Sequence, residues 1–144
     1  MLSLSAASTI IDTAIAEARS RSLAPIVVAV LDAGGHLVAY KREDKSGIIR
    51  FDIAFGKAWG SLGMGFGSRE LTERSAKNPA FFSALGVVSQ GRIVPSPGGV
   101  LIVDADGDII GAVGISGDTG DNDEVCAIAG IEKAGFRAVP KMNT

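Results

Sequence analysis

The sequence predicts an α/β protein in which a five-stranded, mostly antiparallel sheet lies between two layers of helices. Segments 26–41 and 100–115 each combine an apolar strand, a glycine-containing turn and a second strand, which is the pattern of a β-hairpin. The runs IVVAVL at 26–31 and VLIV at 100–103 are apolar without alternation, which is typical of strands covered on both faces. Such strands need cover on both sides, so we expect a three-layer α/β/α arrangement.

The remaining elements follow from helical spacing and from capping signals. Apolar residues recur every three or four positions at 4–18 and at 51–62. The first helix should end near Ser22, because Pro25 disfavours helical geometry in the residue before it. Asp121 and Glu124 form a capping-box pattern that predicts a last helix from Asp121 to about Lys133. Within 65–98 we expect short helices at 71–75 and 79–85, and a short fifth strand at 92–94.

Three glycines interrupt the predicted helix at 48–64. Each of Gly56, Gly60 and Gly63 costs about 0.5–1 kcal/mol relative to alanine inside a helix. We therefore expect something to approach this helix closely, either a neighbouring helix or a flat ligand.

Composition limits the classes of function. The chain has 144 residues, of which 47% are hydrophobic and 21% charged, so we expect one folded domain spanning 1–144. A formal charge of −2 gives no basic field for nucleic acid or anionic lipid. The first twenty residues lack a signal-peptide pattern, and the single Cys126 excludes an internal disulfide. These features favour a cytoplasmic protein without nucleic acid or membrane partners.

Several residues invite a chemical interpretation beside a structural one. His36 is the single histidine and could ligate a haem iron, although a solvent-facing strand residue is the more ordinary role. The stretch 104–108 fails the spacing of a calcium loop, and hairpin-turn chemistry explains it better. The acidic residues at 118–124 suit a helix N-terminus. The sequence contains no nucleophile-elbow motif for a hydrolase and no second histidine for a zinc site.

Other side chains could form the walls and charges of a binding pocket. Arg42 and Lys57 could pair with a carboxylate or propionate, although either could be a solvated surface residue. Trp59 and Phe66 could wall an apolar pocket, although core packing is the commoner role of such aromatics.

Three segments in their order along the chain carry a resemblance. IVVAVLDAGGHLVAYKRED, IIRFDIAFGKA and PSPGGVLIVDADGDIIGAVGISGDTGDNDEVCAIAG resemble the GlcG/HbpS family of haem-associated proteins, which also includes the C-terminal domain of PduO-type proteins. The resemblance covers nearly the whole chain. Positions that match the family pattern are Asp32, Gly35, Arg42, Asp44, Lys57, Ala58, Gly98, Gly99, Gly111, Gly114, Ser116, Gly117, Asp123 and Glu124.

The resemblance implies a profilin-like α/β/α fold, self-assembly into a homodimer or larger symmetric oligomer, and haem as the cofactor of some members. Our first hypothesis is a small-ligand-binding module with a sensing, storage or auxiliary role. Its pocket would lie near the glycine-bearing helix and the loop 95–99 and would take haem or another flat acidic ligand. The expected contacts are Arg42, Lys57, Trp59, Phe66, Gly98 and Gly99.

Two other functions remain open from the sequence. The first is an auxiliary enzyme in small hydroxy-acid, diol or aromatic catabolism, with Lys57 as base or cation and Asp123 or Glu124 as its acid-base partner. The second is a structural or assembly subunit that binds no ligand.

Overall fold

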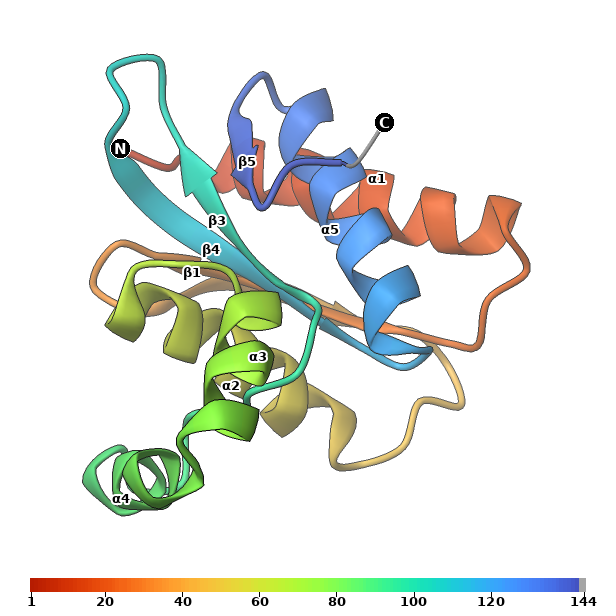
Figure 1. Ribbon diagram of the computed structural model, residues 1–144. Coiled ribbons are helices and arrows are strands. Elements are labelled where there is room, and N and C mark those ends of the chain that lie inside the picture. Colours follow the sequence, from red (N-terminus) through yellow and green to blue (C-terminus); the bar gives the residue numbers. More distant parts are fainter. Residues whose placement is uncertain (143–144) are drawn as a thin grey trace.

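The computed structural model describes residues 1–142, which form five helices and one five-stranded antiparallel sheet (Figure 1). The predicted fold class is therefore confirmed. No helix in this part of the chain is long and apolar enough to cross a membrane. In chain order the elements are α1 Leu4–Ser20, β1 Val27–Asp32, β2 Leu37–Arg42, α2 Arg50–Met64, α3 Ser68–Lys77, α4 Pro79–Val88, β3 Gly99–Val103, β4 Ile109–Ser116, α5 Gly120–Lys133 and β5 Arg137–Val139.

The two predicted hairpins lie side by side in the sheet. The strand order is β2-β1-β4-β3-β5, and every neighbouring pair is antiparallel. Strand β1 pairs with β4 along its whole length, from Val27 opposite Ser116 to Asp32 opposite Gly111. The most apolar strands therefore occupy the middle of the sheet, as their unbroken apolar sequences require.

Helices cover both faces of the sheet, which gives three layers (Figure 1). Helices α1 and α5 pack on each other and on one face, where Ile10 and Ile131 belong to the same apolar cluster as Val28 and Val113. Helix α2 covers the other face, where Ala58 packs with the alternate strand residues Leu31, Leu101 and Ala112. Successive strand residues point to opposite faces, so both sides of each central strand are buried.

Helix α2 lies unusually close to the strands beneath it. A Cβ atom at Gly114 would lie 1.8 Å from the carbonyl oxygen of Ala54, and one at Gly99 would lie 2.3 Å from that of Lys57. No side chain fits at either position, because the helix backbone itself fills the space. Glycine in β3 and β4 thus sets the depth at which α2 packs.

The close approach predicted from the glycines of α2 exists, but its partner is neither a helix nor a ligand. A Cβ at Gly56 would meet the carbonyl oxygen of Arg92 and the side chain of Val94, and one at Gly60 would meet Ile93. The chain's own segment 92–94 therefore fills the groove at Gly56 and Gly60. Val94 also donates its N–H to the Gly56 carbonyl at 3.3 Å.

Two predictions at the edges of the fold need correction. The strand expected at 92–94 is wrong, because that segment lies along α2 with irregular backbone, and the fifth strand is β5, paired with β3. The capping box at Asp121 is also wrong. Helix α5 begins one residue earlier, and its N-cap is Thr119, whose hydroxyl accepts from the Asn122 N–H at 3.2 Å.

Replacing Gly114 by alanine tests the close packing of α2. The new methyl group would displace the helix from the sheet, so Gly114→Ala should lower the free energy of unfolding by at least about 2 kcal/mol, measured by urea denaturation. Gly86→Ala in α4 is the matched control, because nothing lies within 4 Å of its added Cβ. The control should be neutral or more stable by about 0.5–1 kcal/mol. Equal stability of the two variants would contradict the packing argument.

Candidate functional site

A buried ion pair lies where the two helical layers meet at the end of the sheet. The ammonium of Lys57, from the middle of α2, lies 3.2 Å from Oδ2 of Asp123, in the first turn of α5. It also donates to the carbonyl oxygen of Ile115 in β4 at 2.8 Å. The side chains are 4% and 1% exposed. The structure thus brings together Lys57 and Asp123, two residues that the sequence suggested as partners.

The surroundings of this pair leave it closed to solvent. Oδ1 of Asp123 accepts from the Asp118 N–H at 3.1 Å, and Gly98 lies so close that an added Cβ would be 2.9 Å from the Lys57 ammonium. Burial lowers the pKa of Lys57 and raises the pKa of Asp123, while the attraction between the two groups opposes both shifts. Each of the two groups therefore depends on the charge of the other to remain ionised.

Glu124 does not join Lys57, although the sequence grouped them. Arg69 in α3 binds both carboxylate oxygens of Glu124, each 3.1 Å from its Nε, and also pairs with Asp121. Burial is the main cause of the raised pKa of Glu124. Sequence reasoning missed Arg69, because 55 positions separate it from Glu124 and no local pattern indicates the contact.

Ser68 was also missed. It is buried at the start of α3, and its hydroxyl accepts from the Gly99 N–H at 2.6 Å. The sequence analysis placed the start of this helix near residue 71, and no local pattern at Ser68 indicated its contact with β3.

The remaining predicted pocket residues are scattered. Arg42 is exposed at the end of the edge strand β2. The guanidinium of Arg92 lies 4.0 Å above the ring of Trp59, and that of Arg74 lies 4.3 Å above the ring of Phe66. Both aromatic rings are thus already stacked against cations of the chain itself.

The pocket expected beside α2 is filled by the protein. Gly98 and Gly99 are buried under α2, and the Lys57 ammonium is occupied by Asp123 and Ile115. These residues therefore offer no open surface to a ligand.

Open hollows lie elsewhere on the surface. One, of about 350 Å³, lies at the turn between β1 and β2 and is lined by His36, Asp32 and Gly34 together with Met1, Leu2, Ala33, Ile109 and Ile110. A second, of about 250 Å³, lies between α2, α3 and α4 and is lined by Met64, Arg74, Lys77, Asn78, Phe81 and Phe82.

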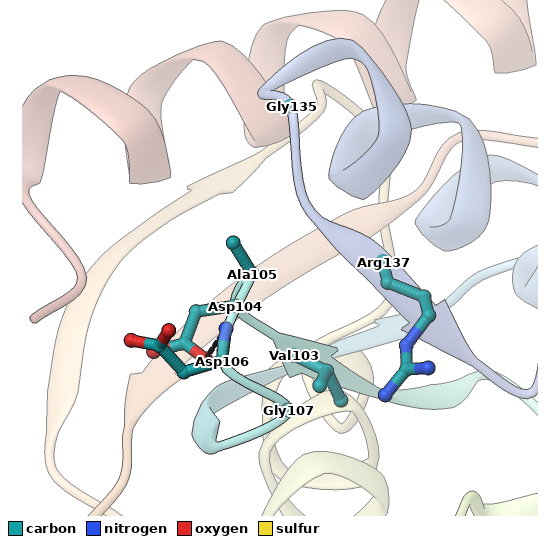
Figure 2. A pocket seen from close by; sticks show the side chains of 7 residues that line it. All are labelled: Val103, Asp104, Ala105, Asp106, Gly107, Gly135 and Arg137. Atoms are coloured by element: carbon teal, nitrogen blue, oxygen red, sulfur yellow. Dashed lines mark hydrogen bonds between the residues drawn. The ribbon is translucent and has the colours of Figure 1, made fainter.

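A third hollow lies between the β3–β4 turn and the loop before β5 (Figure 2). Figure 2 shows the carboxylates of Asp104 and Asp106 on one side of it and Arg137 on the other. Oδ1 of Asp104 accepts from the N–H groups of Asp106 and Asp108 at 3.0 and 2.9 Å. These are the contacts of a hairpin turn, as the sequence indicated.

The chain matches a family of known proteins over most of its length. The family described as "Haem degrading protein HbpS-like" matches residues 2–132. The chain belongs to this HbpS-like family. A relative from Citrobacter freundii, described as an uncharacterized 15.0 kDa protein in the dhaT-dhaS intergenic region, is 32% identical over 103 residues, which are 72% of this chain and 71% of that protein.

Solved structures of similar proteins share the fold of this HbpS-like chain. The PduOC:heme complex matches with a TM-score of 0.84 and 27% identity over 94% of this chain and 96% of that one. The ORFY protein of Klebsiella pneumoniae gives 0.83 and 28% identity over 92% and 90% of the two chains. HbpS gives 0.78 and 27% over 91% and 88%.

Removing the ammonium of Lys57 should leave the buried carboxylate of Asp123 without a counter-charge. We expect Lys57→Met to lower the free energy of unfolding by about 3–5 kcal/mol at pH 7, measured by urea denaturation. The double variant Lys57→Met/Asp123→Asn is the control and should recover part of the loss, because an amide oxygen can still accept from Asp118.

The stability of the single variant should also depend on pH. Without the ammonium, the pKa of Asp123 in the folded protein rises further above its ordinary value of 3.8. The folded state then binds a proton more tightly than the unfolded state, so the variant should lose stability as pH rises from 3.8 through that raised pKa. The double variant should lack this dependence; finding it there would assign the effect to another group.

Proposed function

We propose that this HbpS-like protein binds haem or another flat acidic ligand and serves in sensing, storage or an auxiliary role. The observation that carries the proposal is the likeness to the PduOC:heme complex, which extends over 94% of this chain at 27% identity. The family description, which names haem, points in the same direction.

The residues of the chain are chemically suited to haem. Haem needs an apolar wall for its ring, water or cations for its propionates, and at least one axial ligand. The hollow at the β1–β2 turn combines an imidazole with the apolar side chains of Leu2, Ile109 and Ile110. When bound there, haem would supply an iron centre held by its own four nitrogens. The protein would contribute the ligand, the wall and access to water.

Binding is favoured over catalysis as the role of this chain. The sequence suggested Lys57 and Asp123 as candidates for acid-base chemistry, and both are buried and bonded to one another. We also propose a location in the cytoplasm. The single cysteine, Cys126, cannot form an internal disulfide, and the absence of structural disulfides is typical of proteins from a reducing compartment.

A haemin titration tests the proposed function. We expect a saturable shift of the Soret band with a stoichiometry of about one haem per chain. Iron-free protoporphyrin is the control, because its binding separates recognition of the flat acidic ring from ligation of the iron. An absorbance that grows in proportion to added haemin without saturation would exclude a specific site.

We further propose that copies of this chain associate through α4. None of the ten residues from Pro79 to Val88 is buried and none is charged, and Val87 and Val88 are 79% and 77% exposed. Helix α4 also stands apart from the three layers (Figure 1). A second copy is the natural occupant, because a two-fold contact buries the same apolar patch twice.

Charge placed on α4 should break this association. We expect light scattering to give a dimer or larger oligomer for the unaltered protein and a smaller species for Val87→Glu/Val88→Glu, because the new carboxylates would have to be buried in the contact. Gln90→Glu, just beyond the helix, is the control and should leave the mass unchanged. An unaltered protein that is monomeric would contradict the proposal, as would a double variant of unchanged mass.

A further inference from the structure

We propose that His36 is the axial ligand of the iron of a porphyrin bound at the β1–β2 turn. This inference rests on the proposed binding of haem and names the group that would hold the iron. It concerns the β1–β2 turn and not the 95–99 loop, beside which the sequence suggested a pocket.

The imidazole of His36 is presented for ligation with one nitrogen free. Its side chain is 81% exposed, and its Nδ1 lies 3.2 Å from Oδ1 of Asp32. A carboxylate at this position favours the tautomer that carries its proton on Nδ1 and leaves the lone pair of Nε2 available. Hydrogen bonding of this kind fixes the ring and makes the free nitrogen a stronger metal ligand.

Asp32 is itself held in place by the turn. Its Oδ1 accepts from the N–H groups of Gly34 at 2.9 Å and His36 at 3.0 Å. These two hydrogen bonds fix the carboxylate beside the ring, so it can orient the imidazole.

The backbone of the turn packs against the imidazole ring of His36. A Cβ at Gly34 would lie 2.9 Å from Cε1 and 3.0 Å from Nδ1 of His36, so the imidazole lies directly over the glycine backbone. Gly35 has a φ of 81° and faces the indole of Trp59, 3.2 Å from where its Cβ would be. The ring therefore has support from below by the backbone and from the side by Asp32.

The hollow beside His36 suits a macrocycle better than a bare metal ion. Its other lining groups include Leu2, Ile109 and Ile110, and Ile109 is 40% exposed. A zinc site needs three or four protein ligands, whereas His36 is the only histidine and Cys126 is buried in the core. A porphyrin already supplies four nitrogens, so one imidazole and an apolar wall complete the site.

Spectroscopy of haemin-loaded variants tests the assignment. We expect His36→Ala to weaken haemin binding at least tenfold and to lose the histidine-ligated Soret band. Added imidazole should restore that band, which a purely structural role of His36 would not predict. Because the side chain is exposed, the variant should fold normally, and thermal unfolding checks this.

Two further variants test how the ligand is positioned. Asp32→Asn should keep binding but lower the iron–histidine stretching frequency of the ferrous protein in resonance Raman spectra. A neutral amide accepts a weaker hydrogen bond from Nδ1 than a carboxylate does, so the imidazole becomes a weaker ligand of the iron. Gly34→Ala should displace the ring and weaken binding. Met64→Leu, in the hollow beside α4, is the matched control and should leave the spectrum unchanged.

The outcomes separate this inference from the proposed function. An unaltered protein that shows no saturable Soret shift would overturn both. A protein that binds haemin with the same spectrum and affinity after His36→Ala would overturn the ligand assignment and leave the binding function standing. Loss of the band in Met64→Leu would move the iron to the α4 hollow and would also overturn the assignment.

Discussion

The contact between Lys57 and Asp123 is the constraint on which the three-layer arrangement depends. Helix α2 lies on one face of the sheet and α5 on the other, and these two side chains meet beyond the end of β4. Two buried charges are costly unless they are paired, so neither layer can shift without exposing an unpaired charge to an apolar interior. Lys57 also donates to the carbonyl oxygen of Ile115 in β4, so this one ammonium contacts the sheet as well as α5. The three layers therefore meet at Lys57.

Glycines in the sheet make the contact between Lys57 and Asp123 geometrically possible. The backbone of α2 descends onto β3 and β4 at Gly99 and Gly114, which brings Lys57 level with the end of β4. Because α2 packs so closely on the sheet, it leaves no space for a ligand in the region where the sequence suggested one. The open hollows lie at the rim instead, at hairpin turns and beside α4. The open hollows of this molecule thus lie at the edges of a tightly packed three-layer structure.

The sequence contained enough to predict the layers but not the contacts between them. The central strands have long apolar runs bounded by turn glycines, and the helices have clear periodicity, so both could be found locally. Strand β5 has three residues and no alternation, and it exists because β3 offers an edge. The sequence left Asp123 and Glu124 both open as partners of Lys57, and the structure selects Asp123, 66 positions away. The groove of Gly56 and Gly60 proved to hold segment 92–94. Such contacts depend on how the chain returns on itself.

The two edges of the sheet limit how copies of this protein can assemble. One edge is β5, which is only three residues long and is followed by Pro140, a residue with no N–H to donate. The other is β2, which ends in Lys41 and Arg42 and pairs with β1 through an irregular register. Neither edge is a template for adding strands from another chain. Growth into open-ended fibrils is thereby disfavoured, and any assembly must be built from helix faces, which allows it to close after a fixed number of subunits.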